Sequence, residues 1–229
     1  MKMGREHILN KINEQLGSDE PGRRGESIAR MRIQAHDNNL MPGRGCINEG
    51  SLDDLFSVEA ERVTTTVAHV DNMDAIPVAV ADYLSARNLP SAVRLAPHPD
   101  LLEPDWEADT LLSVSSGIAD GEDEVSVTRA LAGVAETGTL VMVSGPETPT
   151  TLNFLPLNNI VVVRRSEIKG TYEEVWAEIR SRTESGMGTP TLPRTVNWIT
   201  GPSRSADIEQ TLLLGAHGPQ RLHILIVDD

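Results

Sequence analysis

The sequence predicts an α/β protein with a mostly parallel sheet flanked by helices and an N-terminal helical extension. Short apolar runs, such as residues 92–95, 160–164 and 222–227, alternate with segments of helical periodicity. This alternation is typical of parallel sheets, because the connection between two parallel strands needs a crossover, usually a helix. The run Ile160-Val161-Val162-Val163 is apolar on both faces, as expected for a strand buried between two layers.

The N-terminal part differs in composition from the rest of the chain. Apolar side chains recur at helical spacing in residues 3–16, which predicts an amphipathic helix. Residues 17–50 are rich in Gly, Arg, Asn and Asp, which predicts a linker or an arm that orders against a partner. We therefore expect an N-terminal helix and flexible arm over residues 1–50, and an α/β domain over residues 51–229.

The elements of this domain follow from periodicity and from turn residues. Its first half predicts a helix over 52–61, a strand over 63–70, a helix over 74–87 and strands over 92–95 and 110–114. Its second half predicts strands over 124–128, 139–143, 160–164, 195–200 and 222–227, with a short helical turn over 129–134. A capping box at Thr171-Tyr172-Glu173-Glu174 predicts a helix to about residue 182, and a further helix is expected over 205–214.

Charge and cysteine content exclude several classes of function. The 34 acidic and 20 basic residues give a formal net charge of −14, which argues against nucleic acid and anionic membranes as partners. The single cysteine, Cys46, excludes an intrachain disulfide and an iron–sulfur cluster held by this chain's cysteines alone. Its polar setting predicts a free surface thiol.

Motifs for common cofactors and targeting signals are absent from the sequence. The six histidines show no spacing typical of a metal site, and neither GxGxxG after a strand nor GxxxxGK[ST] is present. No long apolar stretch predicts a signal peptide or a membrane span. We therefore expect a cytoplasmic protein with no metal and no cofactor of its own.

A turn near the C-terminus predicts an anion site. The segment Gly201-Pro202-Ser203-Arg204-Ser205 follows an apolar strand, and Ser203 or Ser205 could cap a helix that carries Asp207 in its first turn. Backbone N–H groups at such a helix start, beside the cation of Arg204, would suit a phosphate or a carboxylate. The alternative is that Arg204 is an ordinary surface arginine.

Three blocks of sequence carry a resemblance to a known family. Residues 197–209 with Gly215-Ala216-His217-Gly218-Pro219, residues 135–141, and the stretch from Leu155-Pro156 to Val163 resemble the lactate utilization protein C family of LUD-domain proteins. The resemblance implies a fold like that of ribose-phosphate isomerases and coenzyme A transferases. It also implies a non-cluster component of a cytoplasmic system that oxidises L-lactate to pyruvate with iron–sulfur partner proteins.

Within these blocks, two residues are candidates for catalysis. Glu136 could act as a general base or, by analogy with coenzyme A transferases, as a nucleophile; it could equally be a structural carboxylate in the turn that Gly138 permits. His217 could shuttle a proton, or fix its turn by a hydrogen bond. We expect Thr137, Gly138 and Thr139 to lie beside the Gly201 turn and to contact the same small anion.

Three functions therefore remain open at the level of sequence. The first is the lactate utilization component. The second is a small-molecule isomerase or coenzyme A transferase-like enzyme in which Glu136 is the reactive carboxylate. The third is a regulatory ligand-binding module without turnover.

Overall fold

The computed structural model describes residues 2–15, 23–35, 41–46, 51–108, 111–184, 192–206, 212–215 and 217–228. The chain divides into two compact units, Met1–Leu40 and Met41–Asp229. The boundary at residue 50 that the sequence suggests remains a prediction.

The first unit contains two helices, α1 (Lys2–Gln15) and α2 (Arg23–Ala35). The first confirms the predicted helix, and its apolar side chains Ile8, Leu9 and Ile12 are exposed. The second lies in the segment for which a linker or an arm was expected, where no helix was predicted. Arg, Glu, Ala, Met and Gln dominate this segment, and their good helix propensity outweighs its polar composition.

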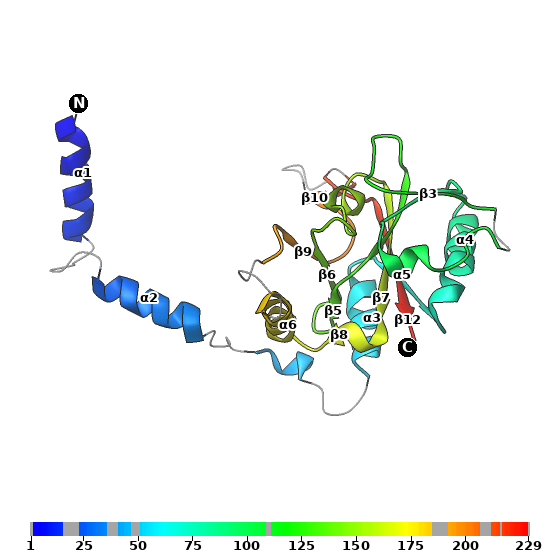
Figure 1. Cartoon of the computed structure of the whole chain (residues 1–229), viewed down its shortest axis with the longest axis horizontal. Coiled ribbons are helices and arrows are strands. Elements are labelled where there is room, and N and C mark those ends of the chain that lie inside the picture. Colours follow the sequence, from blue (N-terminus) through cyan, green and yellow to red (C-terminus); the bar gives the residue numbers. More distant parts are fainter. Residues whose placement is uncertain are drawn as a thin grey trace. The chain divides into compact units, whose positions relative to one another are not determined.

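Six parallel strands form the central sheet of the second unit, in the order β1-β12-β7-β4-β2-β3. Their bounds are β1 (Thr66–Val70), β2 (Ala92–Leu95), β3 (Ser113–Ser116), β4 (Val125–Arg129), β7 (Asn158–Arg164) and β12 (Arg221–Val227). Figure 1 shows two of the central strands of this sheet, β7 and β12, side by side. The predicted α/β class with a mostly parallel sheet is confirmed.

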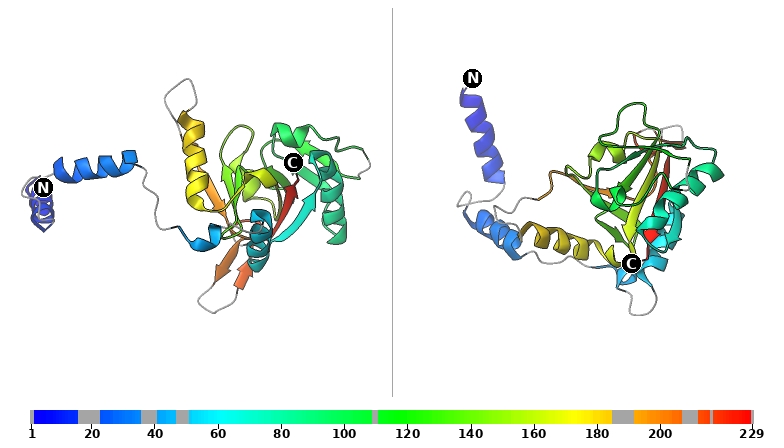
Figure 2. Two further views of the ribbon diagram at one scale, coloured as in Figure 1. Left: turned by 90° about the horizontal axis from the view of Figure 1, so that it is seen from below. Right: turned by 45° about the vertical axis from the view of Figure 1, so that its right-hand side comes forward.

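Helices cover the sheets on both sides. The α-helices of this unit are α3 (Leu52–Arg62), α4 (Ile76–Ala86), α5 (Pro99–Leu102) and α6 (Tyr172–Glu184). Short 3-10 helices are η1 (Gly43–Gly45), η2 (Met73–Ala75), η3 (Thr150–Asn153) and η4 (Arg165–Glu167). Figure 2 shows α4 and α6 on opposite sides of the strands.

Alternate side chains of β7 build two separate cores. Ile160 and Val162 face the core that includes α4, whereas Val161 and Val163 face the core that includes Phe56 of α3. This alternation follows from the two-residue period of a strand. It explains why the strand is apolar along almost its whole length.

A second sheet, in the order β8-β5-β6-β9, packs between α3 and α6. Its strands are β8 (Ile168–Lys169), β5 (Ala132–Val134), β6 (Thr139–Val143) and β9 (Val196–Ile199), and β6 is antiparallel to both of its neighbours. The helical turn predicted over 129–134 is therefore wrong, because residues 132–134 form a strand that hydrogen-bonding partners on both sides hold extended. The strands predicted over 139–143 and 195–200 exist, but in this mixed sheet.

The helix predicted over 205–214 is wrong at both of its described ends, whereas its middle, residues 207–211, lies outside the described residues. The described ends belong to β10 (Arg204–Ala206) and β11 (Leu212–Leu214), which pair antiparallel with Arg204 opposite Leu214. Ser203 and Ser205 resemble a helix cap in the sequence, but cross-strand pairing determines the backbone of β10. The predicted helix start at Thr171 is confirmed, since the Glu174 amide donates to Thr171 Oγ1 at 3.4 Å and Glu174 Oε2 accepts from the Gly170 amide at 3.1 Å.

Two further expectations concern the surface. Cys46 is exposed and free, as expected. Within the described ranges, the structure holds no helix with the length and apolarity needed to cross a membrane.

Candidate functional site

Four of the predicted site residues come together around one cavity, which we call the Gly201 cavity. It has a volume of about 290 Å³ and is lined by Gly201, Ser203, Arg204 and His217, together with Asn153 and Asn159. The cavity lies at the amino ends of β7 and β12. We expected the strand before this turn and the strand after residue 138 to end at the same edge of the parallel sheet, but the strand before the turn, β9, pairs antiparallel with β6 in the second sheet.

The Gly201 turn is held tightly against the end of α3. Gly201 has φ +81°, and a Cβ atom there would lie 2.7 Å from the Val63 carbonyl oxygen, so only glycine fits without movement. The Ser203 amide donates to the Pro219 carbonyl at 2.9 Å, and the Gly215 amide donates to the Ser203 carbonyl at 3.0 Å. These amides are therefore engaged, and the free helix-start donors that the sequence suggested are not formed.

A donor without a partner among the described residues belongs to a lining side chain that sequence reasoning missed. Asn159 is 1% exposed, and its Oδ1 accepts from Ser126 Oγ at 3.2 Å and from Thr128 Oγ1 at 3.0 Å. Its Nδ2 has no hydrogen-bond partner in the described part of the chain. A buried amide left unpaired costs about 1–3 kcal/mol, so a ligand that accepts from this nitrogen would gain affinity.

Arg204 lies at the rim of the cavity rather than on a helix. It is the first residue of β10 and is exposed, and its Nη2 donates to Thr64 Oγ1 at 2.9 Å and to the Val63 carbonyl. Ser205 follows it in β10, but its side chain is not described. Asp207 lies outside the described residues.

The second predicted segment forms the turn between β5 and β6. Glu136 is 3% exposed, its amide donates to the Gly170 carbonyl at 3.2 Å, and its Oε2 has no partner among the described residues. Gly138 has φ +63°, and a Cβ atom there would lie 2.2 Å from the Ala60 amide nitrogen. The glycine is thus required by the close approach of the turn to α3.

A chain of hydroxyl groups joins this turn to the Gly201 cavity. Thr137 Oγ1 and Thr139 Oγ1 lie 2.7 Å apart, and each lies 2.9 Å from the Tyr172 hydroxyl. Thr139 Oγ1 also lies 2.7 Å from Thr200 Oγ1, and Thr200 lines the cavity. Thr139 is therefore one hydrogen bond away from the cavity, whereas Glu136, Thr137 and Gly138 are not among its lining residues.

His217 lines the Gly201 cavity with an exposed side chain. Its amide lies 3.3 Å from Ser203 Oγ, which accepts the hydrogen bond. This contact ties the segment before β12 to the turn after β9. The cavity therefore brings together an amide, a hydroxyl, an imidazole and a guanidinium group, all of which can donate to an anion.

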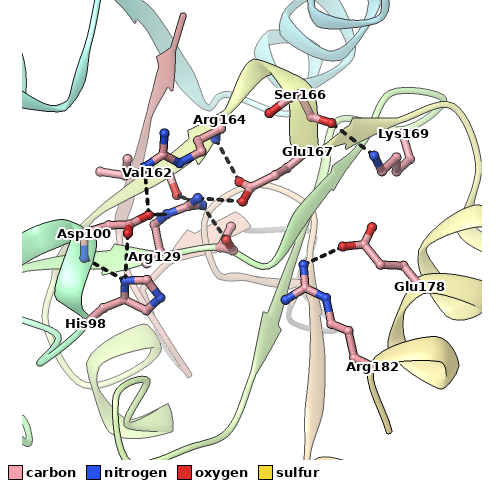
Figure 3. Close-up of polar contacts among 11 residues, drawn as sticks. His98, Asp100, Arg129, Val162, Arg164, Ser166, Glu167, Lys169, Glu178 and Arg182 are labelled. Carbon is pink, nitrogen blue, oxygen red and sulfur yellow. Dashed lines mark hydrogen bonds and ion pairs between the residues drawn. The ribbon is translucent and has the colours of Figure 1, made fainter. Parts of the chain in front are cut away.

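A second site, the carboxyl-edge cluster, was not predicted. It consists of His98, Asp100, Arg129, Arg164 and Glu167 at the carboxyl ends of β2, β4 and β7, beside a cavity of about 480 Å³ (Figure 3). The chain leaves β2 towards β3 but leaves β4 towards β7, so the two strands flank a switch point in the strand order. Ligands of α/β sheets bind preferentially at such points.

Arg129 is the centre of this cluster. Its side chain is 4% exposed, and it donates to Asp100 Oδ2 at 3.1 Å, to Glu167 Oε1 at 2.7 Å and to the Ala130 carbonyl at 2.6 Å. Arg164 donates to the same Asp100 oxygen at 3.2 Å. The network leaves little of the Arg129 donor capacity for a ligand. One signal in the sequence was the arginine that ends the otherwise uncharged strand 125–129.

Burial and charge shift the pKa of two groups in this cluster. Burial alone would raise the pKa of Asp100, but hydrogen bonds and charge from Arg129 and Arg164 lower it below its ordinary value. Burial lowers the pKa of His98, against the opposing effect of the Asp100 charge. His98 Nδ1 accepts from the Asp100 amide at 3.2 Å, which fits a neutral imidazole.

Comparisons with known proteins support the sequence resemblance. The LUD domain model matches residues 121–227, which include the β5–β6 turn, the Gly201 turn and Arg129. Over 98% of its length the chain is 30% identical to lactate utilization protein C of Halalkalibacterium halodurans, and the match covers 98% of that relative. The chain belongs to the lactate utilization protein C family.

Other relatives agree with this membership. Lactate utilization protein C of Bacillus subtilis is 33% identical over 55% of the chain and 50% of its own length. A DUF162 family protein from Deinococcus radiodurans, known from a crystal structure, matches with a TM-score of 0.55 and 20% identity, over 77% of this chain and 96% of that one. This likeness shows that the chain shares the fold of the solved protein.

Proposed function

We propose that this chain is a component of a cytoplasmic system that oxidises L-lactate to pyruvate, and that it holds a small carboxylate in the Gly201 cavity. The similarity to a lactate utilization protein C over 98% of both chains carries the proposal. The oxidation releases two electrons and two protons. With Cys46 as its only cysteine, the chain depends on iron–sulfur partner proteins to accept the electrons.

The chemistry of the Gly201 cavity supports a small carboxylate ligand. Asn159 Nδ2 offers a buried donor without a partner, and Ser203 and His217 offer further donors near it. Arg204 supplies a positive charge at the rim. A volume of about 290 Å³ accommodates a three-carbon hydroxy acid or keto acid.

Co-purification and growth test the role in the pathway. We expect the tagged chain, isolated from cells grown on L-lactate, to retain iron–sulfur proteins, and deletion of its gene to impair growth on L-lactate. The purified chain alone should not reduce a dye with L-lactate. Unchanged growth in a strain without another lactate dehydrogenase would contradict the proposal, and so would robust oxidation by the isolated chain.

Calorimetry with L-lactate and pyruvate tests the ligand site. Asn159→Asp keeps the acceptor for Ser126 and Thr128 but replaces the donor with a carboxylate oxygen, so binding should be lost. Ser203→Ala should weaken binding by about ten-fold. Ser113→Ala, at an exposed serine of the edge strand β3, is the matched control and should bind as the wild type does.

The alternative with Glu136 as a reactive carboxylate rests on one observation. Its Oε2 is buried and has no hydrogen-bond partner among the described residues, as a carboxylate reserved for chemistry would. A covalent acyl intermediate at Glu136 would be trapped by hydroxylamine after incubation with an acyl-coenzyme A, and Glu136→Gln would abolish the trapping. No modification of the wild-type protein would contradict this alternative.

A further inference from the structure

A third cavity lies beside the Gly201 turn and is lined by three arginines. Arg87 follows the last residue of α4, Arg204 begins β10, and Arg221 begins β12. Together with Thr64 and Thr66 they line a cavity of about 400 Å³, which we call the three-arginine cavity. No carboxylate is among its lining residues in the described part of the chain.

These arginines differ from most other arginines whose contacts are resolved. Six arginines form ion pairs with carboxylates: Arg62, Arg94, Arg129, Arg164, Arg165 and Arg182. Among the described residues, the three around this cavity have no ion-pair partner within 4.0 Å. The protein is acidic, with a net charge of −14, and yet the part of the chain that the structure describes offers no carboxylate to these three guanidinium groups within ion-pair distance.

The contacts that these arginines do make are with neutral groups. Arg221 Nη1 donates to Asn158 Oδ1 at 3.3 Å and to Gln220 Oε1 at 3.2 Å, and Arg204 donates to Thr64 and a carbonyl. The guanidinium carbon of Arg87 lies 4.3 Å from the centre of the Tyr83 ring. Such contacts fix the position of the side chains without neutralising their charge.

The backbone beside the cavity is held in an unfavourable conformation. Thr64 has φ +66°, a region that a β-branched residue rarely adopts and that costs about 1–3 kcal/mol. This conformation turns the chain between α3 and β1, so that Thr64 and Thr66 both line the cavity. The Thr64 hydroxyl donates to the Val63 carbonyl at 2.6 Å, and Thr66 Oγ1 lies 2.8 Å from His223 Nδ1. The donors for an anion are therefore the three guanidinium groups.

Like charges gathered without a counter-charge destabilise the folded protein, and a bound anion removes that penalty. The adjoining cavity along β1 is lined by Glu61 and Asp82 and also by Arg87, whereas Arg204 and Arg221 line only the side of the Gly201 turn. A phosphate group fits the arrangement better than a single carboxylate. It carries up to two negative charges, and its oxygens match the paired donors of guanidinium groups.

We propose that the three-arginine cavity binds the phosphate group of a small phosphorylated molecule. The proposal does not rest on the lactate function. Because Arg204 also lines the Gly201 cavity, the informative variants are those of Arg87 and Arg221.

Calorimetry with inorganic phosphate, pyrophosphate, ADP and L-lactate, at low and at high salt, tests this proposal on the full chain. Pyrophosphate should bind more tightly than phosphate, and high salt should weaken both. Arg87→Gln and Arg221→Gln should each weaken pyrophosphate binding by about ten-fold or more. Arg221→Lys should fall between the wild type and Arg221→Gln, because lysine keeps the charge but loses the paired donors.

Two controls make the outcome decisive. Arg182→Gln removes an equal charge from an exposed arginine paired with Glu178, and should bind pyrophosphate as the wild type does. L-lactate binding should be unchanged in Arg87→Gln, which separates this site from the Gly201 cavity. If ADP binds more tightly than pyrophosphate, the proposal is supported and the ligand includes a nucleoside. If the two bind equally, the proposal is supported and the cavity recognises the diphosphate group alone.

The proposal is overturned if none of the phosphate compounds binds at a concentration of about 10 mM, where even a weak complex would be detected. It is also overturned if pyrophosphate binding is the same in the wild type, Arg87→Gln and Arg221→Gln. Binding of L-lactate that depends on Arg221, without binding of phosphate, would assign the cavity to carboxylates instead.

Discussion

The two ends of the central sheet use polar side chains in opposite ways. At the carboxyl edge, Arg129 donates to two carboxylates and a carbonyl, and Asp100 accepts from two arginines. At the amino edge, Asn159 is equally buried but keeps one nitrogen without a partner in the described structure. A saturated network contributes to stability, whereas an unsaturated group gains from a ligand.

This difference matters because strand topology alone would favour the carboxyl edge as the ligand site. The cavity there is also the larger of the two, at about 480 Å³ against 290 Å³. An anionic ligand is nevertheless expected at the amino edge, because the Arg129 guanidinium at the carboxyl edge already donates to two carboxylates and a carbonyl. We therefore expect substitutions at the carboxyl edge to act mainly on folding, and substitutions at the amino edge to act mainly on binding.

The largest expected effect is that of Arg129→Met. The change leaves Glu167 without its ion-pair partner and Asp100 with Arg164 as its remaining one. It should lower the free energy of unfolding by about 3 kcal/mol, the lower end for buried pairs, because both carboxylates are partly exposed. Urea denaturation measures the loss. Arg182→Gln, at an exposed pair, should cost less than about 1 kcal/mol.

The pH dependence of the Arg129→Met effect has a defined sign. The folded pKa of Asp100 is lowered, so its contribution is present above the ordinary carboxyl pKa and is lost as pH falls through the folded value. The difference between the wild type and Arg129→Met should therefore narrow at acidic pH. A loss below about 1 kcal/mol at neutral pH would show that the cluster is not a stability element.

The carboxyl-edge cluster also shows why sequence reasoning missed a site. Arg129 lies 29 residues from Asp100 and 38 from Glu167, so no local pattern connects them. The strand 92–95 was predicted with its observed bounds, because an apolar run between turn residues is a local signal. β5 was missed because the small residues Ala132 and Gly133 have weak strand preference, and pairing with β6 and β8 decides their conformation.

The sequence pointed to four residues that line the Gly201 cavity but not to the structure around them, and their role in ligand binding remains a prediction. Gly201, Ser203, Arg204 and His217 do line one cavity, although the expected helix is a hairpin. The glycines and the turn chemistry are local features that the sequence displays. The Asn159 side-chain nitrogen is not such a local feature. Only the packing of β7 against β4 shows that it lacks a partner among the described residues.

Gly138→Ala tests whether the amino-edge region also contains elements that matter for folding. The new Cβ atom would lie 2.2 Å from the Ala60 amide nitrogen, at a φ of +63°. Strain and overpacking together should cost about 2–3 kcal/mol. Gly121→Ala, where no atom lies within 4 Å of the added carbon, should be nearly neutral in the same thermal denaturation experiment. Equal stability of the two variants would contradict the close approach of this turn to α3.

The buried His223 should make the stability of the protein depend on pH, independently of the two edge regions. Burial lowers the pKa of His223 to about 4, with a smaller lowering effect of Arg87 and an opposing hydrogen bond to Thr66. The unfolded chain takes up this proton at higher pH than the folded one, so stability should fall as pH drops below about 6.5, by about 2 kcal/mol at pH 5. His223→Gln should remove this part of the slope in urea denaturation at several pH values. An unchanged slope in the variant would show that His223 protonates freely in the folded protein.

The smallest effect on stability, with a clear effect on binding, is expected for Arg204→Ala. The arginine is exposed, and its contacts are with a hydroxyl group and a carbonyl, so its loss should leave the melting temperature nearly unchanged. A charge-assisted hydrogen bond to an anion is worth about 1.5–3 kcal/mol, so binding of phosphate or pyruvate should weaken about ten-fold or more. Calorimetry and thermal denaturation of the same two samples measure both quantities. Two outcomes would contradict this expectation: that Arg204→Ala mainly unfolds the protein, or that anion binding is unaffected. Either would show that Arg204 does not bind the anion, and the amino edge would then not differ from the carboxyl edge in the way proposed.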